Sequence, residues 1–153
     1  MKETFTLNEK GLINVAEKVA DILSTNYKAE NSSRAKIILL DGDLGAGKTT
    51  FTKALAEVLG INSDSVHSPT FILKKTYDTS HSLFTKLVHV DAYRFTHPSE
   101  AGVLRLEDDI KNPQAIIAVE WPSKMNYIKS DIELTFNVID EDTREIILSY
   151  DQK

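Results

Sequence analysis

A glycine-rich segment that ends in lysine and threonine is the first feature of this sequence that could do chemistry. Residues 42–49 read Gly-Asp-Leu-Gly-Ala-Gly-Lys-Thr and match the phosphate-loop pattern G-x-x-x-x-G-K-[ST] at every fixed position. Glycines let such a loop turn its backbone N–H groups inward, where they form an anion site with the N-terminus of the following helix. We expect Lys48 to place its charge on the β- and γ-phosphates of a nucleotide and Thr49 to offer a hydroxyl to Mg²⁺.

Two acidic residues each follow an apolar run. Residues 87–90 end at Asp91, and residues 116–119 end at Glu120. Ligands of open α/β sheets bind beyond the carboxyl ends of the strands, so both carboxylates would lie near the phosphates if these strands are parallel neighbours. One carboxylate would help to hold Mg²⁺ and the other would orient the attacking water.

The elements around the glycine-rich segment suit this chemistry. Residues 37–40 are a continuous apolar run, which is typical of a strand buried on both faces. After the loop, apolar residues from Phe51 to Leu59 mark one face of a helix that starts at Lys48 and stops at Gly60. The sequence therefore predicts strand, phosphate loop and helix in succession.

The rest of the chain predicts further alternation of helices and strands. We expect a short strand around Phe5 and Leu7, a helix over 12–23 with Asn8 as N-cap, a surface loop over 26–35, strands over 71–77 and 84–91, a helix over 100–110, a strand over 115–120, and a hairpin of 132–138 and 144–150. The prediction is an α/β fold in a single P-loop NTPase-like domain over 1–153. It has three layers, a mixed sheet that is parallel at its centre, and a C-terminal antiparallel hairpin.

Composition narrows the class of protein. The 153 residues include 41% hydrophobic residues, enough for a sizeable core, and no cysteine, which excludes disulfides and thiolate metal sites. The net charge is −5, whereas a protein that holds nucleic acid alone usually carries a basic field. The sequence shows no membrane-spanning run and no signal-peptide pattern at Met1–Thr4, so we expect a cytoplasmic protein without a membrane partner.

Several other residues leave alternatives open. Ser68-Pro69-Thr70 fits simple turn chemistry, and also a switch segment whose hydroxyls sense the γ-phosphate. Tyr93 and Trp121 closely follow the two acidic residues, and each could belong to the core or stack on a nucleotide or partner. The four histidines show no metal-ligand spacing and are read as surface or strand residues.

Four segments together resemble one family. Residues 42–52, Ser-Pro-Thr-Phe at 68–71, His-Val-Asp-Ala-Tyr-Arg at 89–94 and Val-Glu-Trp-Pro at 119–122 occur in the order and spacing of the TsaE family. The last two motifs are much more specific than the phosphate loop, and the resemblance spans residues 4–150. Residues 98–113 match the family pattern only loosely.

The resemblance implies a role for each matching residue. Thr49 and Glu120 would hold magnesium, Asp91 would be a catalytic base or an outer-shell magnesium ligand beside the catalytic Lys48, and Ser68 and Thr70 would form a switch segment. Trp121, and with it Tyr93, would lie at the site or at a partner surface. ATP would contact Asp43, Leu44, Gly45, Ala46, Gly47, Lys48, Thr49 and Thr50, with Glu9 and Arg144 bracketing the adenine.

The resemblance also implies a function. TsaE proteins are the ATPase subunits of the bacterial machinery that makes threonylcarbamoyladenosine in tRNAs reading codons that start with adenine. They act with a TsaB–TsaD pair and meet tRNA only indirectly, which agrees with the acidic charge of this chain. The expected enzyme is a magnesium-dependent ATPase.

Two other functions stay open from the residues alone. A small-molecule kinase would use Asp91 as the acceptor's base, but kinases of this shape usually carry an arginine-bearing lid, and the four arginines here are scattered. A nucleotide-sensing module would bind without hydrolysis. A GTPase is disfavoured because the sequence contains no Asn-Lys-x-Asp motif.

Overall fold

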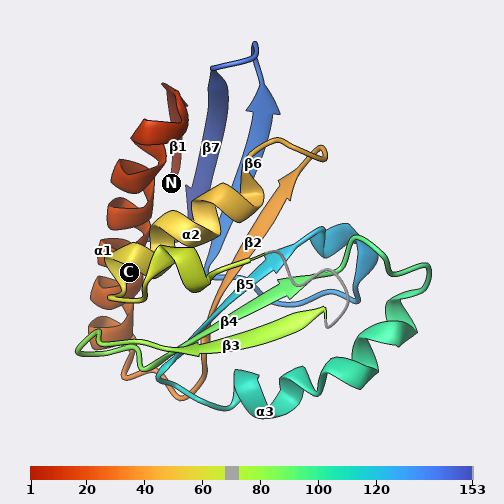
Figure 1. Ribbon diagram of the computed structural model, residues 1–153. Helices are drawn as coiled ribbons and strands as arrows, with labels where there is room; N and C mark the ends of the chain where they lie inside the picture. The colour runs from red at the N-terminus through yellow and green to blue at the C-terminus, as the bar shows by residue number, and fades with distance from the viewer. Residues whose placement is uncertain (68–72, 153) are drawn as a thin grey trace.

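A mixed β-sheet organises the structure, a computed structural model that describes residues 1–67 and 73–152 (Figure 1). Within these residues the strands are β1 (Lys2–Leu7), β2 (Lys36–Gly42), β3 (Lys74–Asp78), β4 (Lys86–Asp91), β5 (Ala115–Glu120), β6 (Ile132–Val138) and β7 (Arg144–Tyr150). Their order across the sheet is β1-β7-β6-β2-β5-β4-β3. Strands β6, β2, β5 and β4 run parallel, while β3, β7 and β1 pair antiparallel with their neighbours. The predicted mixed sheet with a parallel centre is confirmed.

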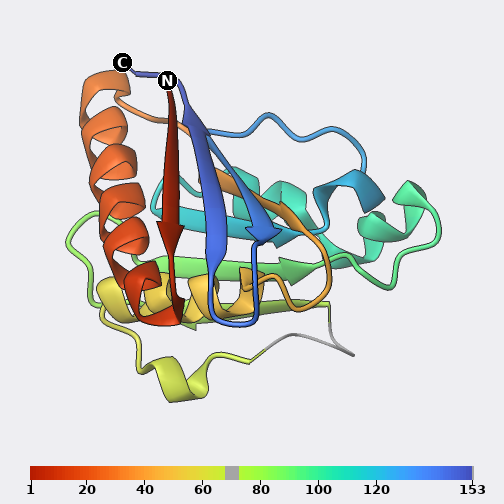
Figure 2. The ribbon, with the colours of Figure 1, turned by 90° about the horizontal axis from the view of Figure 1, so that it is seen from above.

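Helices cover both faces of the sheet. The α-helices are α1 (Leu12–Glu30), α2 (Lys48–Val58) and α3 (Leu106–Ile110), and the longest of four 3₁₀ helices in the described residues is Pro98–Leu104. Helices α1 and α2 pack on one face, and α3 with the 3₁₀ helix packs on the other (Figures 1 and 2). The predicted three-layer α/β architecture is therefore confirmed.

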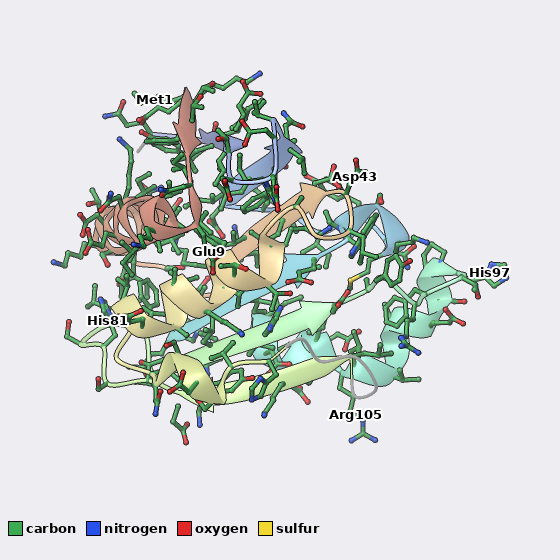
Figure 3. The ribbon with its side chains drawn as sticks, turned by 45° about the horizontal axis from the view of Figure 1, so that its top comes forward. Met1, Glu9, Asp43, His81, His97 and Arg105 are labelled. Carbon is green, nitrogen blue, oxygen red and sulfur yellow. The ribbon has the colours of Figure 1, made fainter. Side chains whose placement is uncertain are left out.

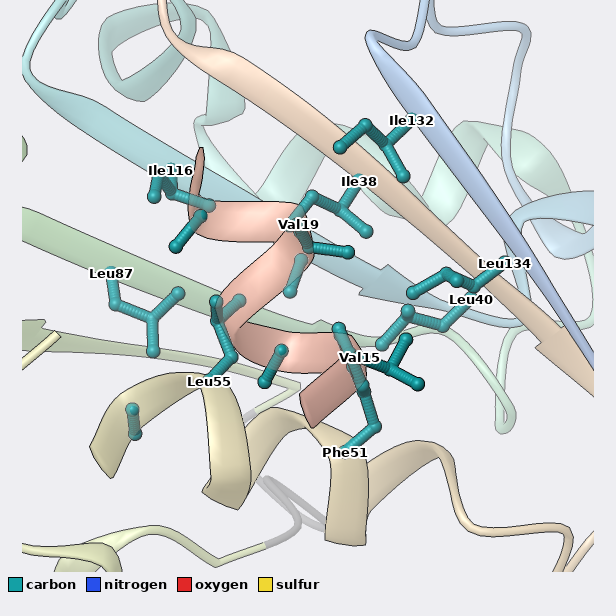
Figure 4. Close-up of a cluster of buried hydrophobic side chains, with 14 of the residues drawn as sticks. Val15, Val19, Ile38, Leu40, Phe51, Leu55, Leu87, Ile116, Ile132 and Leu134 are labelled. Carbon is teal, nitrogen blue, oxygen red and sulfur yellow. The ribbon is translucent and has the colours of Figure 1, made fainter. Parts of the chain in front are cut away.

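The central strands are apolar on both faces because each face has its own core. In β5, Ile116 and Ala118 join the core under α1 and α2, whereas Ile117 and Val119 join the core under α3. This alternation is the period-2 rule of a strand. The core under α1 and α2 is the larger of the two, and Figure 4 shows part of it, with Val15 of α1 between the sheet and α2. The central parallel strands are therefore buried on both faces by helices.

The predicted C-terminal hairpin is present, and it is buried on one face only. Along β6, Ile132, Leu134 and Phe136 are buried, while the alternating residues face outward and Val138 is exposed. Strand β1 completes this edge by pairing along β7, so the two ends of the chain lie close together (Figure 2).

Helix α1 corrects the prediction of a surface loop over 26–35. The helix continues to Glu30, and it ends at Asn31, which adopts a left-handed conformation with φ of 49°. Asn26 is buried and donates a hydrogen bond to the backbone oxygen of Asp151 over 3.2 Å. Tyr27 packs edge-on against Phe84 at 5.5 Å. These tertiary contacts sustain a last turn whose sequence is polar.

Other boundaries also differ from the prediction. Asn8 caps a short 3₁₀ helix, Glu9–Gly11, by accepting a hydrogen bond from the Gly11 N–H, and α1 starts after it. The helix expected over 100–110 is instead the 3₁₀ helix Pro98–Leu104 followed by α3, because Arg105 between them is left-handed, with φ of 52°. No helix in the described part of the chain is long and apolar enough to cross a membrane.

Candidate functional site

The glycine-rich segment joins β2 to α2 at the carboxyl edge of the sheet, as the sequence predicts. Gly42 has φ of 150°, and a Cβ on it would lie 2.7 Å from the backbone oxygen of Phe136, so a larger residue would clash with β6. Gly47 precedes α2 with φ of 111°, a conformation that side chains strongly disfavour. The N-terminus of α2, where Lys48 and Thr49 begin the helix, consequently faces the loop.

Lys48 is buried beneath this loop. Its Nζ donates to the carbonyl oxygen of Gly42 and, over 3.3 Å, to that of Asp43. The same Nζ lies 3.7 Å from the centroid of the Trp121 ring, which is a close cation–π contact. Lys48 thus contacts both the loop and the segment that follows β5.

Burial and nearby charge act in opposite directions on Lys48. Desolvation lowers the pKa of its ammonium below the usual value, while the carboxylates of Glu120, Asp41, Asp91 and Asp43 raise it. Burial wins because removing an ammonium from water costs more than these charges return. The buried Lys48 ammonium would therefore be stabilised by an additional anion in the site.

Glu120 lies beside Thr49 because of strand register. It is paired with Leu40 of β2 and with Asp91 of β4, so the ends of three parallel strands align. The Thr49 hydroxyl donates to Glu120 Oε1 over 2.7 Å. The two residues predicted as magnesium ligands are therefore in direct contact.

The Glu120 carboxylate is almost fully buried yet favours ionisation. Desolvation is the largest single influence and raises its pKa, but hydrogen bonds from His89 and Thr49 and the charge of Lys48 together hold the pKa below the usual value. Glu120 is thus an anionic carboxylate surrounded by hydrogen-bond donors.

Asp91 ends the neighbouring strand on the same face of the sheet. It is partly exposed, and its Oδ1 accepts a hydrogen bond of 3.0 Å from the Tyr93 N–H. The exposed Tyr93 ring lies 5.0 Å from the Trp121 ring. Trp121 itself has a left-handed backbone, with φ of 57°, so the chain turns sharply after Glu120. Such a conformation costs about 1–2 kcal/mol for a non-glycine residue, and here it accompanies the contact of the ring with Lys48.

A groove of about 1010 Å³ extends from the loop along the outer side of α2. Gly45, Gly47 and Thr50 line it at the loop, and Glu9 and Arg144 line it from the two ends of the chain. Arg144 Nη2 donates to the Gly45 carbonyl over 3.5 Å, which links the hairpin to the loop. The residues expected to bracket adenine therefore share one groove with the loop.

Three comparisons place the chain among known proteins. The model of the family described as threonylcarbamoyl adenosine biosynthesis protein TsaE matches residues 7–146. This chain belongs to the TsaE family. Curated relatives described as tRNA threonylcarbamoyladenosine biosynthesis protein TsaE include one from Aquifex aeolicus, 34% identical over 95% of this chain and 94% of the relative. Another, from Haemophilus influenzae, is 30% identical over 86% of this chain and 77% of the relative.

A solved structure agrees with the fold. The crystal structure of Bacillus subtilis YdiB superposes with a TM-score of 0.63 and 26% sequence identity, covering 97% of this chain and 84% of that chain. The P-loop NTPase-like architecture predicted from the sequence pattern is consistent with this likeness.

The oxygen donors at this TsaE site fit magnesium. Mg²⁺ takes one or two protein oxygens and completes its shell with water and phosphate oxygens. Thr49 and Glu120 supply a hydroxyl and a carboxylate that already touch. No group of three or more His, Asp or Glu residues is arranged to hold a metal within the described residues. The chemistry here suits a metal that arrives with a nucleotide.

The described site lacks the predicted switch residues and includes one histidine that the sequence did not single out. Ser68 and Thr70, the expected switch, lie outside the described residues. Asp43, Leu44 and Gly45 form the exposed part of the loop, while Ala46 is buried beneath it. His89, read only as a surface or strand residue, is fully buried, with Nε2 3.2 Å from Glu120 Oε1. Its position two residues before Asp91, on the same face of the strand, was the available signal. Figure 3 shows His81 and His97 on opposite sides of the molecule, so these two histidines do not form a common site with each other.

Proposed function

We propose that this protein is a magnesium-dependent ATPase that supports threonylcarbamoyladenosine formation in tRNA through a TsaB–TsaD pair. The observation that carries the proposal is the contact of Thr49 with Glu120 at the mouth of a loop that has Lys48 beneath it. Together they provide two oxygen ligands, one cation and a helix N-terminus at one point. TsaE membership supports the tRNA pathway.

The proposed chemistry is transfer of the γ-phosphoryl group of ATP to water. The loop N–H groups and Lys48 would bind the β- and γ-phosphates, and Thr49 and Glu120 would hold Mg²⁺, which would supply positive charge to the phosphate oxygens. Asp91 orients a water molecule so that its oxygen attacks the γ-phosphorus. The bond from that phosphorus to the β–γ bridging oxygen breaks, and the products are ADP, phosphate and a proton that leaves the attacking water for solvent.

The partner pair carries the nucleic acid in this proposal. The net charge of −5 gives the chain little attraction for the tRNA backbone. We therefore assign recognition of tRNA to TsaB–TsaD and the nucleotide cycle to this subunit.

The test is ATP hydrolysis by the purified chain, alone and with its cognate TsaB–TsaD pair. We expect hydrolysis to rise with the pair and to vanish in Lys48→Ala and Glu120→Ala. Asp91→Asn should bind ATP but not hydrolyse it, which separates an ATPase from a sensing module. Hydrolysis that ignores the pair, with no co-purification of the pair, would contradict the tRNA role, and phosphate transfer to a small acceptor would favour a kinase.

A further inference from the structure

His89 lies at the centre of β4 and is completely buried. It shares the α2 side of the sheet with Leu87, and its partner in the register is Ala118 of β5. Both of those neighbours belong to the apolar core under α1 and α2. The two ring nitrogens of an imidazole in such surroundings must find hydrogen-bond partners within the protein, because solvent does not reach them.

The two ring nitrogens of His89 have different surroundings. Nε2 lies 3.2 Å from Glu120 Oε1, while Nδ1 has no hydrogen-bond partner among the residues that the structure describes. A carboxylate only accepts hydrogen bonds, so Nε2 carries the hydrogen and donates. A buried nitrogen without a partner is unfavourable, and an apolar side chain would fill this space without it. The contribution of the imidazole therefore comes through Nε2.

The receiving oxygen is the one that also contacts Thr49. Glu120 Oε1 accepts from Thr49 Oγ1 over 2.7 Å on one side and faces His89 Nε2 on the other. A glutamate side chain has several rotatable bonds, and donors from two different elements restrict them. Outer groups that hydrogen-bond a metal ligand commonly fix its orientation in this way.

We propose that His89 is a positioning residue, which holds the Glu120 carboxylate in the orientation that binds Mg²⁺ by donating a hydrogen bond from Nε2. The role rests on the proposed function, since it concerns the same magnesium site. His89 itself touches neither metal nor nucleotide.

The test compares nucleotide affinity with and without the metal. The dissociation constant of a non-hydrolysable ATP analogue is measured by calorimetry in Mg²⁺ and again in EDTA, for the wild-type protein, His89→Leu and His89→Gln. Leucine removes the donor, whereas the glutamine amide restores an N–H at a similar reach. We expect the gain in affinity from Mg²⁺ to fall about tenfold in His89→Leu, to survive largely in His89→Gln, and the EDTA values to stay unchanged.

Three results would overturn this role. An unchanged Mg²⁺ gain in His89→Leu would show that the ring only fills the core. An equal loss of affinity in EDTA would show general damage, and an equal loss in His89→Gln would show that the donor is not what matters. If His89→Leu does not fold, His89→Phe gives the same comparison with a ring retained. A wild-type protein without any Mg²⁺ gain would instead contradict the proposed magnesium site itself.

Discussion

Two buried lysines lie near opposite ends of β2. Lys36 is the first residue of the strand and Lys48 follows the loop after it, with only 1% and 5% of each residue exposed. Desolvation lowers the pKa of both ammonium groups, so both charges are held at a cost. They differ in the groups that surround the charge.

Lys36 is matched by carboxylates. It forms an ion pair with Glu30 at the end of α1, and its Nζ lies 3.7 Å from Asp131 Oδ1. Asp131 also receives both terminal nitrogens of Arg34, over 3.0 and 3.1 Å, and the Ile37 N–H over 2.8 Å. This network connects α1, β2 and the start of β6, and its charges are compensated within the fold.

Lys48 is held by neutral groups. Its Nζ contacts two backbone carbonyls and the face of Trp121, while nearby carboxylates act on its pKa only through their charge. Lys36 has direct carboxylate partners and serves the structure. Lys48 donates to weaker carbonyl acceptors, which the anionic oxygens of a ligand can replace. Lys48 has the arrangement that the proposed ATPase requires.

The largest expected effect is on catalysis at Lys48. Replacing Lys48 with Met removes the charge from the phosphates while keeping the volume of the side chain. We expect ATP hydrolysis to fall about 1,000-fold, the upper end for losing one transition-state donor. Steady-state phosphate release measures it, with Lys36→Met as the matched control, which should hydrolyse ATP normally. Residual activity within a few-fold of wild type would break the distinction between the two lysines.

Lys36→Met should act on stability instead. It leaves Glu30 and Asp131 without one cation in a buried network, and we expect the free energy of unfolding to fall by about 3 kcal/mol. Urea denaturation followed by circular dichroism measures the change. A neutral result would mean that Arg34 alone compensates Asp131.

Lys48→Met should change the free energy of unfolding in the opposite direction in the same urea experiment. Because no ion pair among the described residues compensates the buried charge, we expect its removal to raise the free energy of unfolding by about 1 kcal/mol at neutral pH. The lowered pKa also makes the unfolded chain bind more protons than the folded one between the folded value and 10.5. The free energy of unfolding of the wild-type protein should therefore rise relative to that of Lys48→Met as pH rises through that window. A difference between the two proteins that does not change with pH would contradict the burial cost assigned to Lys48.

The smallest expected effect concerns Trp121. Trp121→Leu removes the aromatic face beside Nζ, and we expect the nucleotide dissociation constant to rise about fivefold, as for a contact of about 1 kcal/mol. Trp121→Phe keeps a ring and should lose less. Calorimetric titration with ADP and Mg²⁺ compares them. Equal losses in the two variants would assign the effect to packing rather than to the cation–π contact.

Much of the site could be predicted because its signals are local in sequence. The phosphate loop is eight consecutive residues, and Asp91 and Glu120 each end an apolar strand. Only the register decides that Glu120 touches Thr49, because the two residues are 71 positions apart. His89 was missed because a lone histidine inside an apolar strand looks like a packing residue until its partner is known.

The helix boundaries show the same division. Polar residues around Asn26 favour a loop by local propensity, but the contacts of Asn26 with the C-terminal segment and of Tyr27 with Phe84 extend α1. In the segment over 98–110, the left-handed Arg105 splits what periodicity alone reads as one helix.

By itself, the sequence determined the α/β class, the phosphate loop and the residue types of the site, because periodicity and glycine spacing are short-range properties. The tertiary structure alone decided which buried lysine is compensated and which oxygen of Glu120 is pinned from two sides. Those outcomes depend on the distances from Lys36 to Asp131 and from Glu120 to Thr49 and His89, and these distances exist only once the sheet is assembled.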